Sequence, residues 1–465
     1  MSREQAVRPD EHVVVVSADG HVGPRLVEDL RPYCPREHLD SYDEMAGRHQ
    51  TARAARAELA AQAARRRKAG DSMEGVAASF NARITNDGPG HHDPSVRLAH
   101  MDGDGVAAEF FYHFSQNGEP LPWISDPLGP PPSVDHAMAE VSYSIYNRWL
   151  ADFCSLAPER LLGLMYLPYW DLELSVEMMT WARDHGLRGA SFPPPGREGV
   201  EPFNSLAWEP FWSAAEDLGV SLHTHASGAP MVDYFAGPGG RRIMFHEITG
   251  YMSRRATWWL VLGEVFERHP NLRLVQTEQS EGWYLATAHE MDSMYLSLTR
   301  AMDTELPRLP SEYLRQCVFA GASFVSQAEV LSASRDGWAD NLIWGRDYPH
   351  AEGTYRQLDD PDAEPYTKRA LRHVFSSVPA GDAVKMAGIN AVRALGLDGD
   401  HLTLVAREIG ALTVAELGRP LEEVPHVDSY AFVGYGGARA VEPQRLEWSN
   451  WAAPLRRAEE LSSQP

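Results

Sequence analysis

Short apolar runs recur along most of the chain, and amphipathic stretches separate them. Eight such runs, most of them continuously apolar, cover residues 13–16, 106–112, 161–167, 188–192, 220–223, 272–277, 317–320 and 342–344. Continuous apolar runs of this length are typical of parallel strands that are buried on both faces. Apolar positions with helical spacing lie between most of them, over residues 135–153, 172–185, 206–218, 253–269, 282–299 and 363–377. This alternation predicts βαβ units, and eight strands predict an α/β fold of the closed (β/α)8 TIM-barrel type.

An open, doubly wound parallel sheet is the alternative to a barrel. That fold is typically marked by a Gly-x-Gly-x-x-Gly fingerprint after an early strand. No early strand of this chain is followed by one. We therefore expect a single barrel over residues 11–396.

Three segments exceed what a minimal barrel needs. An insertion at about residues 40–95 follows the first strand, another at residues 228–249 follows the fifth, and an extension covers residues 397–465. In a barrel, insertions after strands one and five emerge at the catalytic face. We interpret the extra segments as a lid or a dimerisation arm, and we expect a homodimer.

Charge and cysteine usage narrow the class of protein. The 465 residues include 42 Lys and Arg against 65 Asp and Glu, which gives a net charge of −23. A chain this acidic repels phosphate backbones and anionic lipid, so we expect neither nucleic-acid nor membrane partners. The cysteines, Cys34, Cys154 and Cys317, are too far apart for a disulfide framework or a thiolate zinc cluster. With a polar N-terminus and no apolar run near ~18 residues, the chain is expected to be a cytoplasmic enzyme for a small molecule.

Titratable side chains follow four of the predicted strands. They are Asp19 and His21 after the first strand, His223 and His225 at the end of the fifth, Glu278 after the sixth and Asp347 after the eighth. Residues two apart on an extended segment point the same way, and the carboxyl ends of barrel strands converge on one mouth. Each residue alone has an ordinary explanation, such as a hydrogen-bonded core imidazole or an Asx turn. Their joint placement predicts a site.

Two imidazoles and two carboxylates suit a single divalent cation. The set offers nitrogen and oxygen without sulfur, which Zn²⁺ accepts and which Mn²⁺ and Fe²⁺ also accept. We expect one ion per chain, with Zn²⁺ as the first choice. The part played by His225 stays open between support of a ligand, contact with substrate and an ordinary loop position.

A further group of residues is a candidate for substrate binding. Its members are His113, Trp283, Arg346 and His350, with Arg241 and Arg242 as additional cationic partners for a substrate carboxylate. His350 can instead orient Asp347. Packing is the alternative explanation for Trp283, which lies beside an apolar run.

Five sequence blocks make the chain resemble a known family. They are Asp19-Gly-His21, Leu98-Ala-His-Met-Asp-Gly-Asp-Gly-Val106, Gly263-Glu-Val-Phe-Glu-Arg-His-Pro270, Glu278-Gln-Ser-Glu281-Gly-Trp283 and Trp344-Gly-Arg-Asp347-Tyr-Pro-His350-Ala-Glu352-Gly-Thr354. In this order, over about residues 11–396, they are similar to the amidohydrolase-2 family. This is the branch of the amidohydrolase superfamily that resembles aminocarboxymuconate-semialdehyde decarboxylase and γ-resorcylate decarboxylase.

The resemblance implies a metal-dependent TIM barrel with one catalytic divalent ion. The implied ligands are Asp19, His21, His223 and Asp347. The acidic first ligand is similar to the γ-resorcylate decarboxylase type, in which strand six supplies a His and a Glu three residues later. Here Glu278 stands at the His position and Glu281 is the later Glu, so decarboxylase chemistry does not carry over directly. Residues 188–195 contain no Lys, so the bimetallic type with a carboxylated lysine is not supported.

Metal-dependent hydrolysis of a small organic molecule, aromatic or otherwise planar, is our main functional hypothesis. Asp347 then orients or deprotonates a metal-activated water, and Glu278 passes the proton to the leaving group. Glu281 and His225 are further catalytic candidates. The alternative is a nonoxidative decarboxylase or related lyase that acts on a carboxylate-bearing substrate. A third hypothesis is a barrel that binds a ligand without catalysis.

Overall fold

The computed structural model describes residues 7–66, 88–124, 135–226, 243, 246–247, 250, 252–279, 282–297, 305–350, 353–355 and 363–422. Eight strands form one sheet, and their hydrogen-bonded order follows the chain. They are β1 (Val16–Ser17), β2 (Ala108–Phe111), β3 (Leu161–Met165), β4 (Gly189–Ser191), β5 (Ser221–Thr224), β6 (Leu274–Thr277), β7 (Val318–Ser323) and β8 (Leu342–Gly345). Each pair of neighbours from β1 to β8 is parallel.

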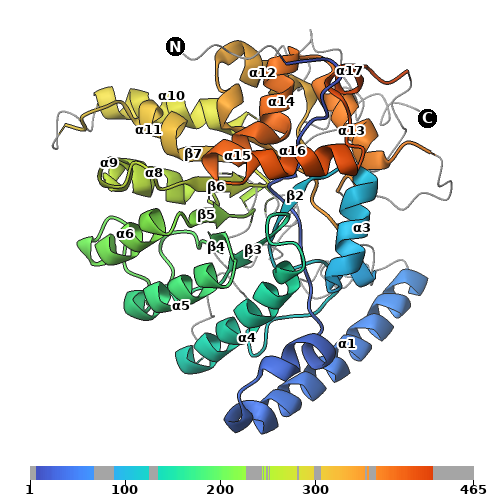
Figure 1. Cartoon of the computed structure of the whole chain (residues 1–465). Helices are drawn as coiled ribbons and strands as arrows, with labels where there is room; N and C mark the ends of the chain where they lie inside the picture. The colour runs from blue at the N-terminus through green and yellow to red at the C-terminus, as the bar shows by residue number, and fades with distance from the viewer. Residues whose placement is uncertain are drawn as a thin grey trace, which may run out of the picture.

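The first and last strands close the sheet into a barrel. The Ala18 amide donates to the Trp344 carbonyl at 2.8 Å, and the Asp347 amide donates to the Asp19 carbonyl at 2.9 Å. A parallel bridge also joins Gly20 to Tyr348. The predicted TIM barrel is therefore confirmed, and Figure 1 shows its helices arranged outside the strands.

Helices connect the strands where the apolar spacing changes to the helical period. Those from β1 to β5 are α1 (Leu39–Arg66), α3 (Pro94–Asp104), α4 (His136–Ser155), α5 (Leu172–Asp184) and α6 (Glu209–Asp217). Those from β5 to β8 are α8 (Arg255–Leu262), α9 (Val265–Arg268), α10 (Trp283–Ser297), α11 (Pro310–Cys317) and α12 (Gln327–Asp336). After β8 come α13 (Tyr366–Phe375), α14 (Ala380–Val384), α15 (Asn390–Ala394), α16 (Gly399–Glu408) and α17 (Val414–Leu417). None of the helices in the described ranges has the length and apolar character needed to cross a membrane.

Short helical turns, labelled η, fill several of the connections. They are η1 (Leu26–Leu30), η2 (Arg31–Tyr33), η3 (Arg36–His38), η4 (Pro89–His91), η5 (Leu206–Trp208), η7 (Ala339–Asn341) and η8 (Lys385–Ile389). Several of the longer helices begin at an acidic cap. Asp93, Asp135 and Asp171 accept backbone N–H bonds at the starts of α3, α4 and α5, as the preference for Asp at this position predicts.

Apolar side chains from alternate positions along the strands fill the barrel interior. This inner core includes Val14, Val16, Ala18, Phe110, Leu162, Leu164, Val275, Phe319 and Ile343. The same core continues into the segment that follows η8, with Ala391, Leu395, Leu402 and Val405. The chain therefore closes one end of the barrel with its own C-terminal helices.

The described part of the C-terminal extension lies at the amino ends of the strands. The Val13 amide donates to the Leu412 carbonyl at 2.8 Å, and His12 forms an antiparallel bridge with Thr413, just before β1 begins. The side chains that follow the carboxyl ends of the strands lie at the opposite end of the barrel. Residues 397–422 therefore pack as a floor and do not serve there as a lid, while 423–465 fall outside the described residues.

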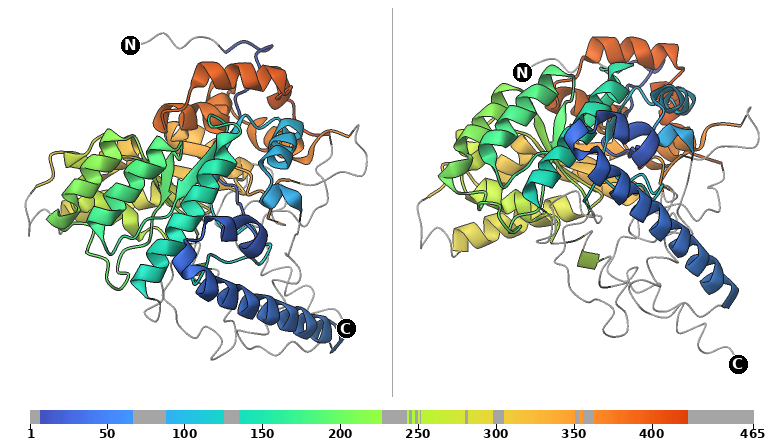
Figure 2. Two further views of the ribbon diagram at one scale, coloured as in Figure 1. Left: turned by 60° about the horizontal axis from the view of Figure 1, so that its bottom comes forward. Right: turned by 90° about the horizontal axis from the view of Figure 1, so that it is seen from below.

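The first insertion contains the long helix α1, which extends away from the barrel (Figure 2). Tyr42 and Ala46 near its start are buried, and the Arg53 guanidinium pairs with Glu119. The helix continues as far as Arg66. Most of the second insertion, including Arg241 and Arg242, lies outside the described residues.

Candidate metal centre

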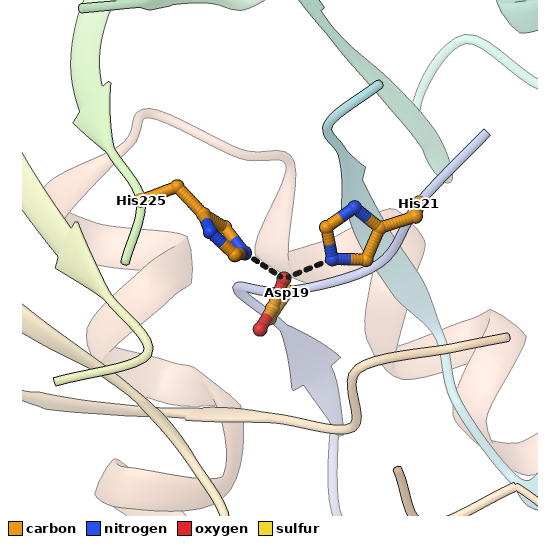
Figure 3. Close-up of side chains that lie close together, drawn as sticks. All are labelled: Asp19, His21 and His225. Carbon is orange, nitrogen blue, oxygen red and sulfur yellow. Dashed lines mark ion pairs between the residues drawn. The ribbon is translucent and has the colours of Figure 1, made fainter. Parts of the chain in front are cut away.

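Three side chains from two distant strands meet at the carboxyl end of the barrel (Figure 3). Asp19 and His21 follow β1, and His225 follows β5. Asp19 Oδ1 lies 3.3 Å from His21 Nε2 and 3.5 Å from His225 Nε2. Because residues two apart on an extended segment point to the same side, the Asp-Gly-His order directs both first-strand groups to one point.

A second group shares His21 with the first. Asp347, two residues beyond β8, has its Oδ1 3.1 Å from His21 Nε2 and 2.8 Å from His350 Nδ1. The His350 ring stacks on the His21 ring with centroids 3.9 Å apart, and its Nε2 lies 2.7 Å from the Phe114 carbonyl oxygen. In each group the possible ligand atoms lie within 4.8 Å of one another. Four of the predicted site residues, Asp19, His21, His225 and Asp347, are therefore brought together.

The polar atoms at the centre of this arrangement are buried and incompletely satisfied. Asp19 Oδ1, His21 Nε2, His225 Nε2 and both Asp347 oxygens have no hydrogen-bond partner among the described residues. Buried polar atoms without partners are rare and need an explanation, such as an ion. Two carboxylates and two imidazoles directed at one another fit a divalent cation.

The charged groups of this centre shift one another's pKa values. Burial lowers the pKa of His21, but the adjacent carboxylates of Asp19 and Asp347 outweigh this effect and raise that pKa to about 9. His225 behaves in the same way: burial lowers its pKa, but Glu278 and Asp19 raise it to about 9. Burial opposes ionisation of Asp19, yet the two imidazoles hold its pKa well below the usual range. Asp19 thus stays charged where a cation would need a carboxylate.

His223 takes a different place from the one expected of a ligand. Its Nε2 lies 2.8 Å from Ser221 Oγ, and its Nδ1 lies 3.4 Å from the Tyr112 hydroxyl. Neither group of possible ligands within the described residues includes it. His223 lies one layer deeper in the barrel than His225, and it is His225 that lies in the group of possible ligands with Asp19 and His21. Burial lowers the His223 pKa to about 3, which keeps that ring neutral.

Glu278 lies directly behind His225. Its Oε2 is 3.3 Å from His225 Nδ1, and its backbone, with φ 57°, lies in the left-handed region, as does that of Asp347 with φ 55°. Non-glycine residues in this region are uncommon and cluster at functional sites. Burial raises the Glu278 pKa to about 7, against the opposing effect of His225. Glu281 falls outside the described residues.

Most of the candidates for substrate binding contact other groups of the protein. Arg346 is fully buried, and its guanidinium pairs with Glu109 at 2.6 Å and with Asp104 at 2.6 Å. Because these carboxylates occupy it, the guanidinium does not reach a substrate carboxylate. Trp283 is buried against Tyr284, which supports the packing explanation. The carbonyl of His113 accepts from His21 Nδ1 at 2.9 Å, while its ring lies against Tyr146.

The sequence pattern did not predict two residues that contact the site. The Ser323 hydroxyl donates to Asp19 Oδ2, and Arg97 donates to the His21 carbonyl. Ser323 ends β7, whose last residues are Gly, Ala and Ser, so the apolar run at 317–320 ends before the strand does. Arg97 lies on α3, where a lone Arg carries no signal. Only the Asp-Gly-Asp-Gly block that follows could have directed attention to this helix.

Comparison with known proteins shows the family of the chain. A family model described as Amidohydrolase matches residues 130–397, which is more than half of the chain. No curated protein matches it.

Solved structures share the fold at low identity. The 5-carboxyvanillate decarboxylase of Novosphingobium aromaticivorans, complexed with manganese and 4-hydroxy-3-methoxy-5-nitrobenzoic acid, is 17% identical over 85% of this chain and 100% of that chain, with a TM-score of 0.54. The corresponding enzyme of Sphingomonas paucimobilis is 17% identical over 83% and 100%, with a TM-score of 0.53. An amidohydrolase of Mycobacterium avium subsp. paratuberculosis is 17% identical over 67% and 76%, with a TM-score of 0.51. At these identities the likeness establishes the fold.

Proposed function

Since the chain belongs to the amidohydrolase family, we propose that it is a metal-dependent lyase that decarboxylates a small aromatic carboxylate without an oxidant. The observation that carries this proposal is the largely buried carboxyl group of Glu278, 16% exposed and placed 3.3 Å from His225 at the edge of the candidate metal centre. A decarboxylase needs an acid of this kind to protonate the carbon that loses its carboxylate. The two 5-carboxyvanillate decarboxylases of the same fold support an aromatic acid as the substrate class.

Four residues would hold the ion: Asp19, His21, His225 and Asp347. When bound, a divalent ion supplies positive charge that binds substrate oxygens and stabilises negative charge developing on the substrate. Zn²⁺ accepts this set, and the two carboxylates also suit Mn²⁺, which the Novosphingobium aromaticivorans enzyme holds. We propose a single ion, whose identity metal analysis would give.

The side chains around the centre have separate tasks in this scheme. The bond between the aromatic carbon and the carboxylate breaks, carbon dioxide leaves, and the electron pair stays on the carbon. Glu278 then delivers its proton to that carbon and recovers one from solvent. A carboxyl group with a pKa near 7 exchanges protons readily at neutral pH. His350 holds Asp347 in place through the 2.8 Å contact.

Hydrolysis is the second candidate, and the state of Asp347 favours it. Both of its carboxylate oxygens are buried without a hydrogen-bond partner among the described residues. Oδ1 contacts His21 and His350, so Oδ2 is the oxygen that could orient a water molecule or accept its proton, as the main hypothesis from the sequence requires. The same centre would then cleave an amide or a lactone.

One assay separates the two reactions. The purified protein, loaded with Mn²⁺ or Zn²⁺, is incubated in deuterium oxide with a panel of aromatic acids, amides and lactones. A lyase releases carbon dioxide and places one deuterium on the aromatic carbon. Turnover of amides or lactones with no carbon dioxide from any acid would overturn the proposal and establish hydrolysis.

We further propose that the protein works in the cytoplasm as a homodimer. All three cysteines are buried and free, as expected in a reducing compartment. Helix α1 extends beyond the barrel and offers surface for a partner. Light scattering on the full chain at micromolar concentration should give twice the 51.7 kDa chain mass, and a monomer would contradict the proposal.

A further inference from the structure

Beneath the candidate metal centre lies a second group of charges, which we call the buried ion cluster. It consists of Arg97 on α3, Asp104 at the end of α3, Glu109 on β2 and Arg346 after β8. Arg97, Glu109 and Arg346 are inaccessible to solvent, and Asp104 is 5% exposed. Arg97 pairs with Glu109 at 2.8 Å, while Arg346 pairs with Glu109 and Asp104 at 2.6 Å each. Two positive and two negative groups are therefore buried together in contact.

The cluster is bonded directly to the segment that carries the first two metal ligands. The Arg97 guanidinium donates to the His21 carbonyl and, at 3.0 Å, to the Gly90 carbonyl. The same guanidinium thus joins α3, η4 and the end of β1. One side chain with a fixed planar geometry makes all of these contacts together with its ion pair.

The cluster also links the segment that carries Asp347 to the segment that carries Asp19 and His21. The Arg346 amide, next to Asp347, donates to Ser17 Oγ at 3.0 Å, and that hydroxyl donates to the Asp19 carbonyl at 2.6 Å. Both guanidinium groups contact the Tyr348 ring: the Arg97 Cζ lies 3.9 Å and the Arg346 Cζ 4.6 Å from the ring centroid. The Tyr348 carbonyl accepts from the His21 amide at 2.6 Å.

Gly20, between Asp19 and His21, lies in close contact with Glu109 of the cluster. A Cβ at Gly20 would lie 2.6 Å from Glu109 Cδ and 2.8 Å from Glu109 Cγ. These separations are shorter than carbon–carbon contacts allow, so any larger residue would displace Glu109 or the ligand segment. The backbone between Asp19 and His21 therefore rests on Glu109.

We propose that Arg97 is a positioning residue, which fixes the segment from Asp19 to His21 against the end of β8 and so sets the metal affinity of the centre. This inference rests on the proposed metal site. Asp19 and His21 follow the first strand of the barrel and Asp347 follows the last, and a cation binds tightly only if their backbones keep a fixed separation. Groups that orient ligands from behind typically contribute 10–100-fold to metal affinity.

The test measures the dissociation constant of Mn²⁺ on the full chain from the electron paramagnetic resonance signal of free Mn²⁺. Arg97→Lys keeps the charge of the cluster and removes the planar fork, and Arg97→Met removes both. We expect Arg97→Lys to weaken Mn²⁺ binding several-fold and Arg97→Met by about 10–100-fold. The spectrum of bound Mn²⁺ should broaden in both variants, which a loss of stability alone would not cause.

Arg160 provides the matched control. It pairs with Asp102 at 2.6 Å and donates to the Ala107 carbonyl at 2.9 Å, at the opposite end of β2. Arg160→Lys and Arg160→Met should lower the unfolding midpoint and leave Mn²⁺ affinity unchanged. A folded Arg97→Lys protein that binds Mn²⁺ as tightly as the wild type would overturn the inference. A wild-type chain that binds neither Mn²⁺ nor Zn²⁺ would overturn the metal site, and this inference with it.

Discussion

The carboxyl group of Glu278 lies beside His225, where the proposed reaction needs an acid. Replacing it with Gln keeps the shape and removes the proton donor. We expect Glu278→Gln to reduce kcat by about 10²–10⁴-fold while the bound metal stays stoichiometric. The measurement is carbon dioxide release together with elemental analysis of the same sample. Glu173→Gln, at an exposed position on α5, is the control and should have full activity. A Glu278→Gln protein with wild-type turnover would exclude this residue as the acid.

His225 and His223 differ in depth by one layer of the barrel, and this difference decides which one meets the cation. His225 Nε2 lies 3.5 Å from Asp19, whereas both nitrogens of His223 face hydroxyl groups. His225→Ala should therefore lose stoichiometric metal. His223→Gln should retain it and lose some stability. Elemental analysis after dialysis compares the two variants, and metal loss in the His223 variant alone would reverse the assignment.

The sequence alone could not distinguish these two histidines. Both follow the same apolar run and point to the same side of β5, so alternation assigns them equally to the interior. Which of the two histidines lies beside Asp19 depends on how far the Asp19 segment extends beyond β1. The sequence of β5 alone does not determine this. Asp19, His21, Glu278 and Asp347 could be predicted because each directly follows a strand, and convergence of strand ends is a property of the fold.

Strands and helices show where apolar patterning is sufficient and where it is not. All eight strands occur at the predicted runs because both of their faces are buried. β7 extends three residues beyond its run, since small residues at 321–323 fit beside neighbouring side chains without an apolar signature. The C-terminal helices were expected to form a lid or an arm. The described ones close the barrel floor, because their apolar positions complete the inner core, and their part in a dimer stays a prediction.

Helix α16 tests this floor directly. Leu402 is fully buried within the inner core, whereas Leu404 on the same helix is 55% exposed. Leu402→Ala should lower the free energy of unfolding by about 2–5 kcal/mol, because it removes packed methyl groups and leaves a cavity. Leu404→Ala should change it by less than about 0.5 kcal/mol. Urea unfolding measures both, and equal effects would show that α16 does not pack as described.

Across the whole molecule, the imidazoles with shifted pKa values are of two kinds, which differ in the direction of the shift. His21 and His225 face carboxylates, and their pKa values are raised, whereas burial lowers the pKa of His91 to about 3 and that of His113 to about 3. The second kind stays neutral in the folded protein. It becomes charged in the unfolded chain below about pH 6.5.

His91 therefore predicts a pH dependence of known sign. Between about pH 6.5 and pH 3 the unfolded state binds a proton that the folded state does not, so folding stability is lost as the pH falls. One proton corresponds to at most ~1.4 kcal/mol per pH unit. His91→Gln should flatten the decline of the urea midpoint between pH 6.5 and pH 4. A variant whose decline is as steep as that of the wild type would show that His91 does not stay neutral.

The account as a whole depends on one cation at the point where the ends of β1, β5 and β8 meet. Crystals grown with Mn²⁺ and measured at the manganese absorption edge would locate that ion by its anomalous scattering. The account predicts one peak per chain, bounded by the side chains of Asp19, His21, His225 and Asp347. A chain with no peak between these four residues, or with its metal bound elsewhere, would contradict it.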